Sequence, residues 1–288
     1  MIYLLISILC SVTVGVLLKL AKRYKINIPQ AVTWNYLFAI GLSIFFFKPS
    51  FKDLASTAHY DIYLGLGVLL PVIFWFLAGS VRNIGIARTD IAQRLSLFIP
   101  ILASYFLFKE HFTITKICGL ALGFIAIFFT LYKKTKQRST IGSWFYPLIV
   151  FVGFGLIDIL FKQVAQIKSI PYTTSLTIVF ILAFIISIVS ILYLRAFKNQ
   201  KLELVNFICG CVLGFFNFFN ILFYLKAHGA MAENPSTVFA SMNMGVIILG
   251  SVIGIFIFKE SLNKLNYWGL FLALAAIILI TLSKIYAI

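Results

Sequence analysis

Long runs of apolar residues alternate along the chain with short segments rich in Lys, Arg, Pro and Asn. A helix of about 20 apolar residues crosses a bilayer core of about 30 Å. Ten runs approach this length and predict membrane-spanning helices at residues 2–20, 30–47, 62–80, 87–108, 113–132, 143–163, 171–194, 205–225, 233–258 and 265–283. An open strand would leave its backbone unsatisfied in lipid, so we expect an all-α integral membrane protein with ten transmembrane helices.

The composition agrees with this pattern, since 62% of the 288 residues are hydrophobic and 11% are charged. A soluble domain is about half apolar and about a quarter charged, so a soluble enzyme and a disordered chain are excluded. The four cysteines lie within apolar runs, where they are better explained as small buried side chains than as metal ligands. The Lys- and Phe-rich, Ala-poor composition is typical of an AT-rich bacterial genome. We therefore expect a multi-pass protein of the bacterial cytoplasmic (inner) membrane.

The net charge of +16 comes from short basic clusters between the apolar runs, for example Lys133–Arg138. In a soluble protein this charge would suggest nucleic acid as a partner. Anionic lipid head groups and the preference of basic loops for the cytoplasm explain the clusters more simply. We expect the lipid bilayer as the partner of these clusters, and no nucleic acid. Most basic residues lie on the face opposite the N-terminus, which favours both termini outside.

Residues 87–134 match residues 237–284 when they are shifted by 150 positions. The clearest match is the string Phe-x-Phe-Lys-Glu, which ends at Glu110 in the first copy and at Glu260 in the second. Nine residues later both copies continue with Gly-Leu, at Gly119 and at Gly269. Apolar bias alone does not easily supply such a string twice. The chain is therefore interpreted as a duplication, with one repeat over residues 1–135 and the other over 136–288.

Each half holds five predicted helices, and an odd number places the second copy upside down in the membrane. The fold prediction is therefore ten transmembrane helices arranged as two inverted five-helix repeats. Inverted repeats are typical of secondary transporters, which bind their substrate near the midplane between the repeats. This pattern favours a transporter over an enzyme.

The ten-helix layout and its repeated motifs resemble the EamA-like family of the drug/metabolite transporter (DMT) superfamily. The matching segments are Ile91–Pro100, Phe108–Glu110 and Gly119–Leu120 in the first half, and Met242–Gly245, Phe258–Glu260 and Gly269–Leu270 in the second. The resemblance implies a carrier of amino acids, sugars, nucleotide derivatives or other small solutes. It also implies both termini inside, against the distribution of basic residues. The second copy departs from the family pattern, because Gly250 stands where the first copy has Pro100.

Ionisable side chains within bilayer segments are costly, so each one is a candidate for function. Arg94 lies about two turns into the fourth predicted helix, with Asp90 and Gln93 at i−4 and i−1. Its guanidinium is suited to bind a substrate carboxylate or phosphate in a bidentate manner. The alternative is a permanent internal pair with Asp90. Both interpretations stay open.

Asp158 lies near the end of the sixth predicted helix, between two isoleucines. It is a candidate proton-coupling carboxylate, or else a fixed partner of Lys162 at i+4 or of Lys19. Both lysines have side chains long enough to reach the membrane surface. Glu233 joins this group of carboxylates and lysines, which serve either in coupling or in internal ion pairs. Glu110 is interpreted as a helix cap.

Polar amides inside the predicted helices are candidates for lining a cavity or for bonding neighbouring helices. Asn217 and Asn220 share one helix face with Tyr224. The full set of candidate substrate-binding residues is Lys19, Asn35, Gln93, Arg94, Asn217, Asn220, Tyr224 and Asn243. No sequence pattern indicates a metal site, a cofactor or a nucleophile with its base, so we expect no enzyme activity and no cofactor.

The chain carries no Walker loop for ATP hydrolysis, so solute or ion gradients would drive transport. The first hypothesis is a secondary-active carrier of small polar metabolites, amino-acid-like zwitterions above all, working by alternating access. An exchanger of organic anions or of nucleotide-derived, phosphorylated metabolites is the alternative. A membrane-embedded enzyme or a channel is the third. A monomer holds both halves and is expected to suffice, with proton coupling as one option.

Overall fold

The computed structural model describes residues 2–24, 26–50, 59–84, 86–131, 145–198, 201–259 and 262–286, and the regular elements in these segments are all helices. They are α1 (Ile2–Arg23), α2 (Ile28–Phe47), α4 (Tyr60–Ile84), α5 (Ile86–Leu95), α6 (Phe98–Phe106), α7 (Ile114–Leu131), α8 (Phe145–Gln166), α9 (Tyr172–Lys198), α10 (Leu204–Ala230), α11 (Pro235–Phe256) and α12 (Lys264–Tyr286). Within the described segments, nine helices are long and apolar enough to cross a membrane. The prediction of an all-α, multi-pass membrane protein is confirmed.

The single helix predicted at 87–108 is not observed. Two shorter helices, α5 and α6, take its place. Pro100 has no backbone N–H, and its ring clashes with the carbonyl of the residue four positions earlier, which is Ser96. The Ser96 carbonyl instead accepts a hydrogen bond from the Ile99 N–H at 3.0 Å. The Leu97 N–H likewise donates to the backbone carbonyl of Arg94 at 3.3 Å. The regular helix is therefore interrupted at Ser96 and Leu97, although Leu97 keeps right-handed helical angles (φ −50°, ψ −27°). The prediction of one continuous helix here was wrong.

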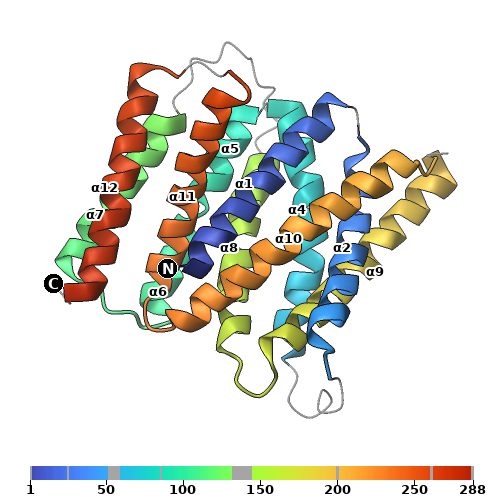
Figure 1. Ribbon diagram of the computed structural model, residues 1–288, viewed down its shortest axis with the longest axis horizontal. Helices are drawn as coiled ribbons and strands as arrows, with labels where there is room; N and C mark the ends of the chain where they lie inside the picture. Colours follow the sequence, from blue (N-terminus) through green and yellow to red (C-terminus); the bar gives the residue numbers. More distant parts are fainter. Residues whose placement is uncertain are drawn as a thin grey trace.

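The helices form a bundle in which α7 and α12 lie side by side at one edge, and α2 and α9 lie at the other (Figure 1). Helix α10 packs against both α1 and α2, while α4 packs against α8 and α9. Small residues allow α10 to approach α2 closely. A Cβ added at Gly210 would lie 2.7 Å from the Ala31 carbonyl oxygen, and one at Gly214 would lie 2.7 Å from that of Asn35.

Helices α7 and α12 meet through two equivalent glycines. A Cβ added at Gly119 would lie 2.8 Å from Cγ1 of Ile280, and one at Gly269 would lie 2.6 Å from the backbone nitrogen of Thr130. Gly269 is the counterpart of Gly119 in the repeat of 150 residues, and Ile280 is the counterpart of Thr130. The start of each helix therefore contacts the end of the other, so that the two run antiparallel with matched contacts.

The repeated Phe-x-Phe-Lys-Glu string turns the chain in the same way twice. The residues that end α6 and α11, Leu107 and Ile257, have φ/ψ angles of −91°/−44° and −90°/−44°. Lys109 and Lys259 both have a φ of 52°, in the left-handed region. The two turns thus share one backbone geometry. Glu260 and the boundary expected between the repeats, at 135–136, lie outside the described residues.

Candidate functional site

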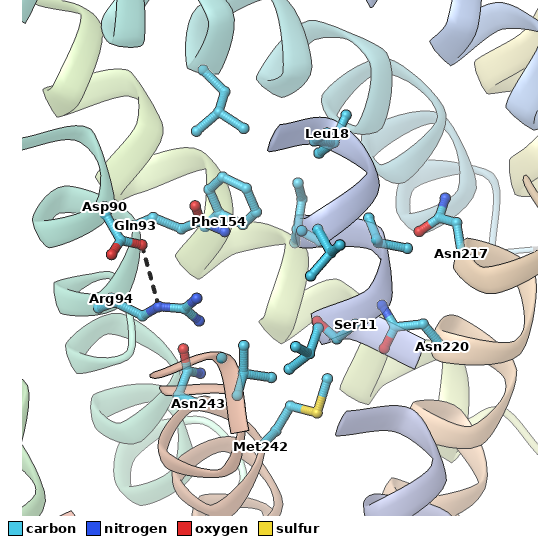
Figure 2. A pocket seen from close by; sticks show the side chains of 18 of the residues that line it. Ser11, Leu18, Asp90, Gln93, Arg94, Phe154, Asn217, Asn220, Met242 and Asn243 are labelled. Carbon is cyan, nitrogen blue, oxygen red and sulfur yellow. Dashed lines mark ion pairs between the residues drawn. The ribbon is translucent and has the colours of Figure 1, made fainter. Parts of the chain in front are cut away.

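A cavity of about 420 Å³ lies between helices from both halves of the chain (Figure 2). Side chains of α1, α4, α5, α8, α10 and α11 line it, together with Ser96 between α5 and α6 and Phe258 after α11. The cavity brings together nine residues that the sequence singles out: Lys19, Asp90, Gln93, Arg94, Asp158, Asn217, Asn220, Tyr224 and Asn243. Their part in binding a substrate stays a prediction.

Helix α5 supplies a charged pair to one wall of the cavity. Asp90, Gln93 and Arg94 lie three and four residues apart, which places them on one helix face. Arg94 Nε is 3.5 Å from Asp90 Oδ1, and their side chains are 18% and 40% exposed. Figure 2 shows the guanidinium reaching from α5 into the cavity, so its terminal nitrogens face the open space. The expected internal pair is formed, and it leaves the end of Arg94 available.

Helix α10 supplies amides to the opposite wall (Figure 2). Asn220 Oδ1 accepts a hydrogen bond from Ser7 Oγ at 2.9 Å, which ties α10 to α1. Asn217, one turn earlier, is 8% exposed and lines the same wall. On α11, Asn243 donates from Nδ2 to the Phe239 carbonyl at 3.2 Å. All three amides thus line the cavity, and Asn220 also joins two helices.

Asp158 of α8 also lines the cavity, and its Oδ1 accepts a hydrogen bond from the Tyr224 hydroxyl at 2.9 Å. The ion pair expected between Asp158 and Lys162 is absent from the described residues. Lys162 Nζ instead donates to the Ala232 carbonyl at 2.7 Å, and the whole residue is buried. Lys162 therefore neither lines the cavity nor reaches the membrane surface, because its ammonium group donates instead to a carbonyl between α10 and α11.

Two further candidates lie away from the cavity. Asn35 of α2 is fully buried where Gly214 of α10 packs on its backbone, and neither amide atom of its side chain bonds another described residue. Glu233 is exposed in the connection between α10 and α11. By contrast, Lys19 lines the cavity, with its Nζ 3.7 Å from the centre of the Phe258 ring.

Several lining residues were missed because they are apolar or small. Phe154, Phe161 and Phe258 give no signal in a chain with 31 phenylalanines. Gly250 and Gly254 lie one turn apart on α11, and this spacing of small residues marks a close helix contact or an opening. This glycine spacing is the sequence signal that could have pointed to Gly250 and Gly254.

A buried polar network lies away from the cavity, in the turn after α6. Lys116 Nζ donates to Glu110 Oε1 at 2.8 Å and to Asn234 Oδ1 at 2.7 Å. Glu110 also accepts bonds from the backbone N–H of Ser236 at 2.9 Å and from its hydroxyl at 2.7 Å. Its carboxylate thus caps the N-terminus of α11 rather than that of α7, and it joins the two halves of the chain.

The architecture is that of a multi-pass membrane protein with a cavity lined by both polar and apolar side chains. The sequence profile of the EamA-like transporter family matches residues 1–132. A protein of Haemophilus influenzae (strain ATCC 51907 / DSM 11121 / KW20 / Rd), described as uncharacterized, is 45% identical over 300 residues, covering 99% of each chain. One crystal structure has a similar fold, with a TM-score of 0.71, 12% identity, and coverage of 97% of this chain and 98% of that one. The chain belongs to the EamA-like transporter family, in the DMT superfamily, whose members are transporters rather than enzymes.

Proposed function

We propose that the chain is a secondary-active transporter of small polar metabolites, with amino-acid-like zwitterions as the preferred substrates. One observation carries this proposal. A cavity at membrane depth is lined by helices of both halves and holds a guanidinium, an ammonium group, two carboxylates and several amides. Such groups are costly within a bilayer and are typical of a solute pathway.

The two halves are proposed to be inverted five-helix repeats, over residues 1–135 and 136–288. Two features support this arrangement: α7 and α12 are antiparallel with contacts matched at a spacing of 150 residues, and the two Phe-x-Phe-Lys-Glu turns share one backbone geometry. Inverted repeats provide two equivalent conformations, in which the same site opens to opposite sides of the membrane. This is the basis of alternating access.

The cavity extends from mid-depth towards one face. Its lining includes Lys19 near the end of α1 and Phe258 after α11, but none of the described residues 107–113, 167–171 or 231–234 at the other face. At that other face the Glu110–Lys116 pair holds the turn after α6 to the start of α11. In our proposal this network closes one side of the pathway, and the network opens when the cavity opens there.

The charges that line the cavity favour zwitterions over organic anions. Two cations, Arg94 and Lys19, and two carboxylates, Asp90 and Asp158, line the cavity, and Arg94 is paired with Asp90. Lys162, which would have added positive charge, lies outside the lining. An exchanger of phosphorylated or nucleotide-derived anions would need a surplus of cations, so it remains the second candidate.

The setting of the proposed transporter follows from its fold and its relative. We infer that it acts in the cytoplasmic membrane of a bacterium, in line with its Haemophilus relative, and that one chain suffices because the cavity is complete within it. Its partners would be the bilayer and a small-molecule substrate, with Asp158 as the residue for proton coupling. No cofactor or nucleic acid enters the proposal.

Uptake into proteoliposomes tests the proposal. The purified protein would be reconstituted, and accumulation of radiolabelled amino acids compared with that of phosphorylated metabolites, with and without a proton gradient. We expect saturable uptake of amino acids that depends on Arg94 and is lost in Arg94→Ala. Uptake restricted to phosphorylated compounds would establish the anion exchanger instead. Empty liposomes and Asp61→Asn, at the exposed start of α4, serve as controls.

A further inference from the structure

The two carboxylates that line the cavity, Asp90 and Asp158, differ in their partners from each other. Asp90 is matched by Arg94 on the same helix, and Glu110 is matched by Lys116. Asp158 has no cationic partner among the described residues, and its recorded bond is the one from the neutral Tyr224 hydroxyl to Oδ1. An ionised carboxylate at membrane depth without a cation is costly unless it takes up a proton or a ligand supplies the opposite charge.

The surroundings of Asp158 are aromatic. Phe154 and Phe161 of α8 and Tyr224 of α10 line the cavity with it. The rings of Phe161 and Tyr224 meet edge to face, with their centroids 6.3 Å apart. Aromatic rings attract cations through their negative faces, and an ammonium group beside a carboxylate gains from both. Tyr224 holds one oxygen of the carboxylate and leaves the other for a ligand.

We propose that Asp158, Tyr224 and Phe161 form a subsite for the primary ammonium group of the transported solute. This inference rests on the proposed function and deepens it, since it limits the substrates to compounds that carry an amine. Asp158 supplies the charge, Tyr224 orients the carboxylate, and Phe161 provides an aromatic wall. Arg94 comes from α5, on another helix, so a substrate carboxylate has a separate group to bind. The two groups together would select zwitterions.

Three compounds with the same branched side chain can test the proposed ammonium subsite and the Arg94 guanidinium separately. Leucine carries both an amine and a carboxylate, 4-methylpentanoate lacks the amine, and 3-methylbutylamine lacks the carboxylate. The side chain of this set suits the aliphatic wall formed by Leu70, Ile73 and Leu77. Binding would be measured by isothermal titration on the full chain in lipid nanodiscs.

In the wild type we expect leucine and 3-methylbutylamine to bind more tightly than 4-methylpentanoate. Asp158→Asn should weaken the two amines by about 10- to 100-fold, because it removes a hydrogen bond to a charged group, while 4-methylpentanoate is unchanged. Phe161→Leu should weaken the amines by about 5-fold. Asp61→Asn, an exposed carboxylate at the start of α4, is the matched control and should change none of the three.

The amide in Asp158→Asn can still accept the Tyr224 hydroxyl, and an unchanged melting temperature would show that the variant folds. Asp158→Glu restores the charge and should recover part of the affinity for the amines. If Asp158→Asn keeps the wild-type preference for leucine over 4-methylpentanoate, the proposed subsite is wrong. Leucine uptake by the wild type would then still support the zwitterion transporter. If the wild type binds phosphorylated compounds and neither amine, both the subsite and the zwitterion transporter are wrong.

Discussion

The segment that holds α5 and α6 and the segment that forms α11 are related by the 150-residue repeat, yet they have different structures. The first is divided between Leu95 and Phe98, whereas α11 is continuous from Pro235 to Phe256. The position of Pro100 in the first copy is occupied by Gly250 in the second. At this position only the first copy has a proline, which removes a backbone N–H from the helix, while the turns that follow keep the same geometry.

The two segments also present different chemistry to the cavity. Gln93 and Asn243 are equivalent in the repeat and both line the cavity with amides. Arg94 lines it as well, but its equivalent, Met244, is fully buried. Both segments thus present an amide to the cavity at equivalent positions, but only α5 presents a guanidinium. This asymmetry supports a site that orients its substrate.

The largest effect is expected at the turn after the broken segment, in Glu110→Ala. This change leaves the Lys116 ammonium buried and removes the cap from α11, so we expect a loss of about 3–5 kcal/mol in the free energy of unfolding. SDS unfolding titrations of the purified protein would measure it. A double variant, Glu110→Leu with Lys116→Met, removes both charges and should recover most of the stability. Equal losses in the single and double variants would contradict the pairing.

The next prediction introduces into α11 the proline that its counterpart has at position 100. Gly250→Pro removes a backbone donor within α11 and should destabilise the protein by about 3 kcal/mol in the same titration. Gly250→Ala is the control, because a Cβ at this position meets nothing within 4 Å. It should leave stability unchanged or raise it by up to about 1 kcal/mol. A destabilised alanine variant would show that space, and not the proline, causes the loss.

The sequence predicts the membrane helices well and the break poorly. Nine spans follow from the length of the apolar runs, since lipid leaves few alternatives to a helix. Pro100 was visible, but a proline in a membrane helix is compatible with a kink as well as with a break. Which one occurs depends on whether neighbouring groups satisfy the freed carbonyl of Ser96, and this is decided by the folded backbone.

The polar candidates could be selected from the sequence but not oriented. Arg94 and Asp158 stand out because charges are rare within apolar runs. Lys162 stands out equally, yet it bonds a carbonyl outside the cavity, because the rotation of α8 and the path of the 231–234 connection decide where its side chain ends. Glu110 was expected to cap a helix, but the helix it caps is in the other half, and only the tertiary structure brings it there.

A third prediction makes the two segments chemically alike. Arg94→Met copies the residue of the second half and removes the guanidinium from the cavity, leaving Asp90 without its pair. Loss of a charged contact of this kind should lower amino-acid uptake into proteoliposomes by about 100-fold, or about 2.7 kcal/mol. Asn243→Ala removes an amide on the opposite segment and should lower uptake by only about 5-fold. Similar losses in both variants would argue against a special role of Arg94.

The smallest effect on stability is expected from joining α5 to α6. Pro100→Ala restores a backbone donor that can bond the Ser96 carbonyl, but it also frees the unfolded chain, so the free energy of unfolding should change by less than about 1 kcal/mol. A continuous helix would nevertheless shift Arg94 relative to Asn243, and we expect uptake to fall several-fold. Hydrogen exchange would show whether the amides of residues 97–100 become protected. Protection without a loss of uptake would mean that the break does not position the site.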